Sequence, residues 1–287
     1  MITRRTLRRT HLLRPDDELN ALFIYCIALV AQRYDIAVHA AVVMSTHEHL
    51  IVTDTRGKLP RFLHELHRLL ALSIKVLRKW EGAVWDHEKT SVVELRTREA
   101  VIEKLAYVMA NPVAAGLVRH AHEWPGVTTH VEELGRAQWT ASRPNVYFDA
   151  DNPAWPASAT VELTMPELEM ADDDVRELVH AELKALELAA VANVKSKGWS
   201  VLGRKRLATL SPFERATSWE ELRSRNPTFA VGRGQREAFF EAVVVLRAFR
   251  SAHRAALELW RTGLREVLFP VGSWHMRYGH GAAVASG

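Results

Sequence analysis

Two histidines separated by a single residue are the clearest sign of chemistry in this chain of 287 residues. His47 and His49 lie in the run 42–52, which is apolar on both sides of them. Such a run is typical of a β-strand, in which residues i and i+2 point to the same face of the sheet. Both imidazoles are therefore expected to lie side by side and to bind one divalent metal ion. Because two ligands leave coordination positions open, we expect a catalytic site rather than a structural one.

A tyrosine and an asparagine further along the chain offer complementary chemistry. Tyr107 and Asn111 are four residues apart in a predicted helix, so both side chains lie on one helical face. A phenol is a weak nucleophile at its ordinary pKa of about 10, but it can attack a phosphodiester that a metal ion polarises. Asn111 would offer a neutral oxygen to the same ion, and the product would be a covalent phosphotyrosine link to DNA. Ordinary packing is the alternative interpretation for each of these four side chains.

The elements that must position these residues are predicted from hydrophobic periodicity and from turn signals. The segment 2–9 is a strand or an extended basic arm, and residues 36–44, 47–54 and 91–95 are strands. Helices are expected from Asp16 or Asp17 to about Arg33, from Pro60 to about Trp80, and over 98–110, where Asn111-Pro112 ends the helix. The order strand, helix, strand, strand, helix, strand, helix predicts an α+β fold with the ferredoxin-like split βαβ arrangement.

A change of composition suggests a domain boundary after residue 135. Residues 138–156 contain several prolines and no clear period. Further on, we expect a strand over 161–165 and helices over 172–195 and 234–262. We therefore expect a domain over 1–135 that carries the candidate site residues. A mostly helical C-terminal extension over 136–287 follows, and the sequence assigns no role to it.

Composition narrows the class of protein and its compartment. The formal net charge is +4, a mildly basic balance that is only weak support for a nucleic-acid partner. Cys26 is the single cysteine, which excludes an intramolecular disulfide and a zinc–thiolate cluster and favours the cytoplasm. The longest apolar run, 22–31, is shorter than the roughly 20 residues that span a bilayer, so we expect no membrane partner.

The basic residues are distributed in a way that suggests phosphate binding. We expect Arg4, Arg5, Arg8 and Arg9 to form a phosphate-binding surface with Lys58 and Arg61, and with Lys75, Arg78 and Lys79 along the second helix. Trp80 and Trp85 could stack on unpaired bases, although packing in the core is an equally good interpretation for each. His64 and His67 are expected to face solvent or phosphate. An ordinary solvated face is the alternative for the whole basic set.

These motifs together resemble a known family. The segment 44–50, Met-Ser-Thr-His-Glu-His-Leu, resembles the Met-x-Asn-His-x-His signature of single-tyrosine HUH transposases. The run 107–118, with Asn111-Pro112-Val113 followed by Ala115-Gly116, is similar to the REP-associated branch of that family. Trp124-Pro125 and the segment 12–15, Leu-Leu-Arg-Pro, match it as well. The resemblance covers roughly residues 1–130.

The resemblance implies a Mg²⁺- or Mn²⁺-dependent endonuclease and strand transferase that acts on single-stranded DNA beside palindromic hairpins. It implies that Tyr107 is the nucleophile, that His47 and His49 bind the metal, and that Asn111 is a third ligand. It favours a monomer, with a dimer that exchanges its tyrosine helices as the alternative.

Two other functions remain open at this stage. The chain departs from the family signature at Glu48, where an apolar residue is usual, and at Thr46, where asparagine is usual. These departures suit a domesticated protein that binds DNA hairpins without cleaving them. An RNA-binding ferredoxin-like protein is a weaker hypothesis, because the chain lacks the paired aromatic residues that such domains stack on bases.

Overall fold

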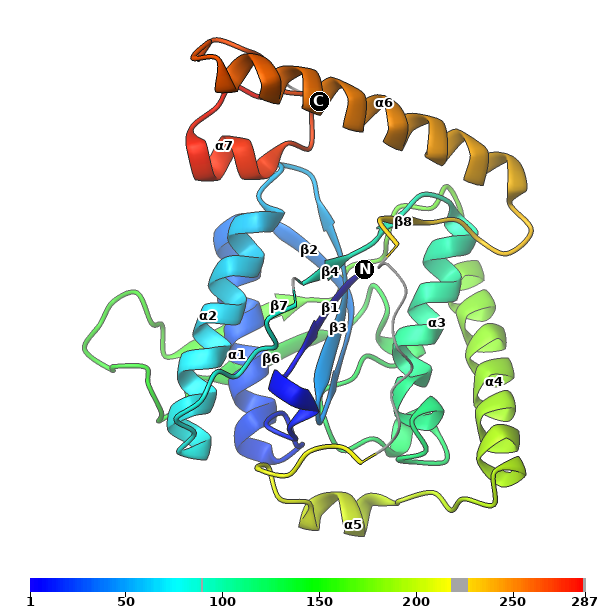
Figure 1. Cartoon of the computed structure of the whole chain (residues 1–287). Helices are drawn as coiled ribbons and strands as arrows, with labels where there is room; N and C mark the ends of the chain where they lie inside the picture. Colours follow the sequence, from blue (N-terminus) through cyan, green and yellow to red (C-terminus); the bar gives the residue numbers. More distant parts are fainter. Residues whose placement is uncertain (89, 218–226, 286–287) are drawn as a thin grey trace.

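The computed structural model describes residues 1–88, 90–217 and 227–285, and a four-stranded antiparallel sheet lies at its centre (Figure 1). The strands are β1 (Ile2–Arg5), β2 (Ile36–Met44), β3 (His47–Asp54) and β4 (Ser91–Val92). Their order across the sheet is β2-β3-β1-β4. β1 pairs with β3 in a register that puts Thr3 opposite His49 and Arg5 opposite His47. The α+β class is confirmed, as are the predicted strands at 36–44 and 47–54.

The first segment is shorter as a strand than its alternating pattern suggested. β1 ends at Arg5, and the 3-10 turn η1 (Leu7–Arg9) follows it. The hydroxyl of Thr6 donates to the carbonyl of Thr10 at 2.6 Å, and the Thr10 backbone N–H donates to Leu7 at 3.1 Å. These local hydrogen bonds replace the interstrand hydrogen bonds that a longer β1 would have formed. The prediction over 91–95 also divides, because β5 (Glu94–Leu95) pairs with β8 (Phe229–Ala230) and not with β1.

Two helices cover one face of the sheet. α1 (Asp17–Tyr34) begins where the Asp16 carboxylate accepts the backbone N–H of Leu19 at 2.9 Å, which satisfies one free donor of the first turn. α2 (Leu59–Arg78) has Pro60 in its first turn, as predicted. Both helices form a large core with the face of the sheet that they cover, and Phe23, Phe62 and Leu66 are buried in this core.

Two further helices form the second side of the molecule. α3 (Arg98–Ala114) packs on β2 and β3, and α4 (Asp172–Ser196) packs along α3 (Figure 1). Their shared core includes Met44, Ile51 and Met109. The sheet is therefore covered on both faces, and the residues of β3 alternate between the two cores.

The predicted end of the third helix at Asn111-Pro112 is wrong. α3 continues through Pro112 and ends at Ala114, and Gly116, whose φ is +68°, terminates it. The backbone N–H of Gly116 donates to Val113 at 2.9 Å and that of Leu117 to Pro112 at 3.0 Å, which is a Schellman ending. A proline removes one helical hydrogen bond, and at this position, in the last turn, that loss does not end the helix.

The segment after residue 135 joins both cores. β6 (Gln138–Ser142) and β7 (Ser158–Glu162) form an antiparallel pair that packs on α1. Ala141, Phe148 and Val161 belong to the core of the first two helices, and Val175 of α4 belongs to the other. The residue limits chosen from the change in composition therefore do not coincide with a separation of the cores.

The C-terminal part is helical and has a small core of its own. α6 (Arg236–Arg261) crosses one end of the molecule, and α7 (Trp274–His280) folds back beneath it (Figure 1). Phe269, Met276 and Ala256 are the centre of this third cluster. It is joined to the sheet layer where the Tyr278 hydroxyl donates to the Gly57 carbonyl at 2.7 Å. The short helices η2 (Ala121–Glu123) and η3 (Val131–Glu133) follow α3, and α5 (Arg204–Thr209) follows α4.

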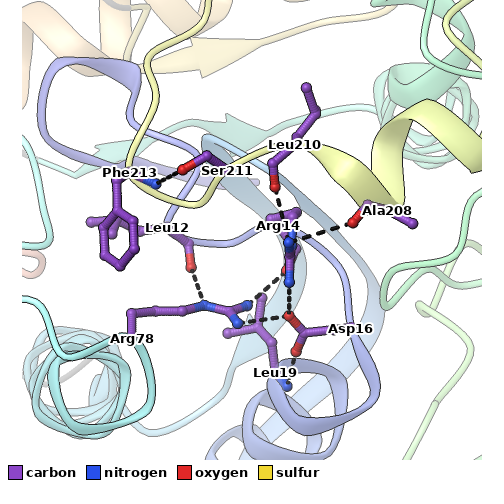
Figure 2. Close-up of polar contacts among 9 residues, drawn as sticks. All are labelled: Leu12, Arg14, Asp16, Leu19, Arg78, Ala208, Leu210, Ser211 and Phe213. Atoms are coloured by element: carbon purple, nitrogen blue, oxygen red, sulfur yellow. Dashed lines mark hydrogen bonds and ion pairs between the residues drawn. The ribbon is translucent and has the colours of Figure 1, made fainter.

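A network of two arginines links the start of α1 and the end of α2 to the C-terminal end of α5 (Figure 2). Arg14 donates to the carbonyls of Leu210 at 2.9 Å and Ala208 at 3.5 Å. Arg78 lies 2.6 Å from the Asp16 carboxylate and donates to the carbonyl of Arg14 at 2.9 Å. Arg78 is buried, so its predicted role on a phosphate-binding surface is wrong.

None of the helices that the structure describes combines the length and apolarity needed to cross a membrane.

Candidate metal and nucleophile site

The two histidines of β3 point to the same face of the sheet, and α3 packs against that face. The Nε2 atom of His47 lies 3.4 Å from the Oδ1 atom of Asn111. The rings of His47 and His49 meet edge to face, with centroids 4.8 Å apart. Glu48 points to the opposite face and contacts α2. The alternation expected of a strand therefore brings both imidazoles to one place.

Hydroxyl groups hold the inner nitrogen of each imidazole. The Nδ1 atom of His49 is 2.8 Å from the hydroxyl of Thr3 across the sheet, and that of His47 is 3.1 Å from the hydroxyl of Thr46. These bonds fix the ring orientation, as the outer partners of metal-binding histidines do. The Nε2 atom of His49 is buried and has no hydrogen-bond partner among the described residues. A buried nitrogen without a partner is costly unless something else binds it.

Both histidines are held in the neutral form. The pKa of His47 is lowered to about 4, mainly by burial; the contact with Asn111 opposes this shift, and the nearby cation of Arg9 contributes to it. Burial also holds the pKa of His49 well below its ordinary value, with His47 as the next cause. Neutral imidazole is the form that binds a metal ion.

α3 places Tyr107 and Asn111 beside these rings. The ring of Tyr107 lies 5.6 Å from that of His49, centroid to centroid. The Nδ2 atom of Asn111 donates to the Tyr107 carbonyl at 3.1 Å, one helical turn back, which directs its Oδ1 atom toward His47. Tyr107 remains 40% exposed, so its ring is accessible from outside. The structure thus brings His47, His49, Tyr107 and Asn111 into one cluster.

Three contacts at this site were missed from the sequence. Thr3 and Thr46 hold the histidines, and the ammonium of Lys104 lies 5.0 Å from the ring centroid of Tyr107. Lys104 precedes Tyr107 by three residues, and this helical spacing was a usable signal. Thr3 could not be recognised, because its contact depends on the register between β1 and β3.

The donor set can be compared with what a divalent ion requires. Among the described residues, no group of three or more His, Cys, Asp or Glu side chains could hold a metal ion. Two imidazole nitrogens and the Asn111 amide oxygen are therefore the protein ligands that this cluster can offer. The free Nε2 atom of His49 fits such a role, and the remaining positions suit water or phosphate oxygens, which Mg²⁺ and Mn²⁺ accept readily.

Glu48 is buried behind the site and not within it. Its carboxylate is 0% exposed and lies 2.7 Å from the Nε2 atom of His67 on α2. His67 in turn contacts the ring of Trp85, whose indole N–H donates to the His67 carbonyl at 2.8 Å. Arg4 is directly opposite Glu48 in the sheet. Glu48, which departs from the family signature, therefore has His67 as its partner on the far face of the sheet.

This arrangement corrects the prediction for His67 and favours core packing over base stacking for Trp85. His67 was expected to face solvent or phosphate, and it is buried against Glu48. Trp85 is also buried, so it is not a platform for bases, and Trp80 stacks on Phe213 with ring centroids 6.1 Å apart.

The predicted phosphate-binding residues do not form one surface. Arg5 is opposite His47 in the sheet, and the charge of Arg9 acts on the pKa of His47, so these two lie near the site. Arg4 points to the other face and donates to the carbonyls of Asp86 at 3.2 Å and Glu88 at 2.6 Å. Arg8, in η1, has its backbone N–H 3.3 Å from the Asp86 carboxylate.

Lys58 and Arg61 are at the opposite end of β3. That strand runs from His47 to Asp54 before the turn that leads to them, a distance of about 23 Å at roughly 3.3 Å per residue. The guanidinium of Arg61 lies over the ring of Tyr278, 4.5 Å from its centroid. The structure therefore separates Lys58 and Arg61 from the two histidines.

Comparisons of the chain with protein-family models, with curated proteins and with solved structures found no match.

Proposed function

We propose that this protein is a metal-dependent DNA transposase that cleaves and rejoins single-stranded DNA near palindromic hairpins. The observation that carries the proposal is the convergence of His47 and His49 from β3 with Tyr107 and Asn111 from α3. A Tyr-x-x-x-Asn spacing in a helix does not require a His-x-His spacing in a strand to lie beside it. Their meeting in one cluster, with Tyr107 exposed at its edge, supports a joint role.

In the proposed reaction, the phenolic oxygen of Tyr107 attacks the phosphorus of a DNA phosphodiester. A bond forms between that oxygen and phosphorus, and the bond from phosphorus to the sugar oxygen of the departing strand breaks. The phenolic proton ends on the departing oxygen, which leaves as a hydroxyl group. The strand held on Tyr107 is then available for rejoining by the reverse attack.

The residues around Tyr107 have distinct parts in this scheme. His47, His49 and Asn111 would hold Mg²⁺ or Mn²⁺, which when bound supplies a positive charge that polarises the phosphate. Thr3 and Thr46 keep the imidazoles oriented. Lys104, whose ammonium lies beside the Tyr107 ring, would provide a cation to the phosphate that Tyr107 attacks.

We also propose a ferredoxin-like arrangement of the sheet and helices, and a protein that acts as a monomer. The order β2-β3-β1-β4, with α1 and α2 on one face, supports the ferredoxin-like arrangement. The contacts of α3 support a monomer in which Tyr107 acts at the histidines of its own chain. α4 packs along α3, and Arg233 forms ion pairs with Glu103 of α3 and Glu182 of α4. These contacts hold the tyrosine helix against its own sheet.

The proposal is tested by covalent capture. The protein is incubated with labelled hairpin DNA that carries single-stranded flanks, with Mn²⁺ or with EDTA, and the products are separated on a denaturing gel. We expect a protein–DNA band with Mn²⁺ that is absent with EDTA and absent in Tyr107→Phe. Tyr147→Phe, another exposed tyrosine outside the cluster, is the matched control and should retain the band. A hairpin-binding protein without nuclease activity would bind this DNA and give no band at any metal concentration.

A further inference from the structure

A large cleft lies on the side of α3 that faces away from Tyr107. It has a volume of about 910 Å³ and is bounded by α3, α4 and the connection through η2 and η3. Met109 is at its floor, and on a helix a residue two positions from Tyr107 points to nearly the opposite side. The cleft is therefore separate from the candidate metal site, but α3 is a wall of both. Its size is that of sites that bind small organic ligands.

The floor of the cleft is apolar. Buried or half-buried aliphatic side chains form it, among them Met109, Val131, Val191 and Val194. Such a floor suits a flat, weakly polar ring better than a fully hydrated ion.

The rim carries aromatic rings that are open to solvent. Trp199 is 63% exposed, although the large tryptophan side chain usually buries most of its surface. His120 and His122 are both exposed and their rings lie nearly parallel, at 3° and 5.5 Å between centroids. Exposed rings beside a cationic groove are the arrangement by which proteins bind unpaired bases.

The charged groups at the rim favour an anion. Arg119, Lys184 and Lys195 line the cleft, and Lys197 lies 4.9 Å from the ring centroid of Trp199. Two carboxylates, Glu132 and Glu187, also line it. Glu187 is already occupied, because it accepts the backbone N–H of Ala121 at 2.6 Å and contacts His120 at 3.5 Å. The cations therefore outnumber the carboxylates at the rim.

We propose that this cleft binds an unpaired nucleotide of single-stranded DNA, with Trp199 stacked on the base and with Lys184 and Lys195 contacting phosphates. The choice of DNA as the ligand rests on the proposed function. The cleft would hold a strand on the opposite side of α3 from the nucleophile, about one helix diameter of roughly 10 Å away.

The test measures binding of a fluorescein-labelled (dT)20 oligonucleotide to the full chain by anisotropy in EDTA, where no cleavage occurs. We expect Trp199→Ala to bind about tenfold more weakly, because one stacked base is lost. Trp199→Phe, which keeps a ring, should stay within about threefold of the unaltered protein. Thermal unfolding of both variants is the control for folding, and both should unfold at nearly the temperature of the unaltered protein.

Salt dependence tests the cationic rim separately. For single-stranded DNA each phosphate contact contributes about 0.7 to the slope of log K against log salt concentration. Lys184→Ser/Lys195→Ser should therefore lower the slope by about 1.4. Arg247→Ser/Arg261→Ser, a pair on the exposed surface of α6, removes the same charge elsewhere and should leave the slope unchanged.

Failure of this proposal can be told apart from failure of the proposed function. If Trp199→Ala binds within twofold of the unaltered protein, or if both double variants change the slope equally, the cleft proposal is overturned even where the Tyr107 adduct forms. If the cleft variants lose binding as expected but no adduct appears with any metal ion, the cleft proposal stands and the nuclease proposal fails. Absence of any binding to (dT)20 overturns the cleft proposal.

Discussion

The rings of His49 and Tyr107 meet edge to face between β3 and α3, with centroids 5.6 Å apart and planes inclined at 72°. One side chain comes from a strand and the other from a helix 58 positions later in the sequence. The Nδ1 atom of His49 is bound by Thr3, so its free Nε2 atom is available to a ligand. Together with His47 and Asn111, this nitrogen would hold a divalent ion beside Tyr107, where the ion would supply positive charge to a phosphate.

Thr3 should control metal affinity although it does not touch the metal. Thr3→Val removes the hydroxyl that orients His49, and we expect Mn²⁺ binding, measured by calorimetry, to weaken by about 10- to 100-fold. Thr53→Val is the matched control, because the Thr53 hydroxyl also contacts a histidine, His39, in the same sheet at 2.8 Å. If the two variants bind Mn²⁺ equally well, Thr3 does not orient a metal ligand.

The buried pair of Glu48 and His67 should be important for stability. Glu48→Ala leaves His67 without its hydrogen-bond partner in the core, and we expect the free energy of unfolding to fall by about 1–3 kcal/mol. The double variant Glu48→Leu/His67→Leu replaces the pair by apolar side chains and should recover most of that loss. Urea denaturation of the three proteins measures both effects. Equal destabilisation by the single and double variants would contradict this view of the pair.

Stability should decrease with acidity in a window set by His47. In the unfolded chain the pKa of His47 takes its ordinary value of about 6.5, and burial lowers it to about 4 in the folded protein. Between these values the unfolded chain binds a proton that the folded chain does not. In EDTA, the free energy of unfolding should therefore fall as the pH drops from about 6.5 to about 4, by about 3 kcal/mol from this residue.

Comparison with a variant isolates this contribution. His47→Gln removes the titrating group, so its free energy of unfolding should depend less steeply on pH across the same window. Urea denaturation at intervals of half a pH unit provides the measurement. A variant as steep as the unaltered protein would show that His47 is not held neutral by burial.

Arginines near the histidines should contribute more to DNA binding than those at the far end of β3. We expect Arg9→Ser to weaken binding of hairpin DNA and to lower its salt dependence, because Arg9 acts on His47. Arg61→Ser should have a smaller effect, since its guanidinium lies over Tyr278 and far from the histidines. Equal effects of the two substitutions on the salt dependence would contradict this division of the basic residues.

Local patterns predicted much of this fold. The alternation around Glu48 was sufficient to place both histidines on one face, and Asp16 and Pro60 marked the starts of α1 and α2. The prediction failed at Pro112, which indicated the end of a helix although the nearby Gly116 terminates it. It also failed where a distant part of the chain determines the outcome. Ser91 to Leu95 was expected to be one strand, but β8 pairs with its second half.

The candidate site was predictable in its residue types and not in its supporting contacts. Tyr107 and Asn111 share a helical face by their spacing alone. The contacts of Thr3 and Glu48 depend on the β1–β3 register and on the packing of α2, which no local pattern contains. The same is true of Arg78, whose position on the outer side of a predicted helix gave no sign of its bond with Asp16.

The central claim, that Tyr107 is a nucleophile toward DNA, is tested most directly by locating the covalent bond. The adduct formed with hairpin DNA and Mn²⁺ is digested with trypsin and nuclease, and the modified peptide is sequenced by tandem mass spectrometry. We predict a nucleotide attached through phosphate to the phenolic oxygen of Tyr107, and no such peptide from reactions in EDTA. A nucleotide attached to any other residue, or DNA cleaved without a modified Tyr107 peptide, would contradict the claim.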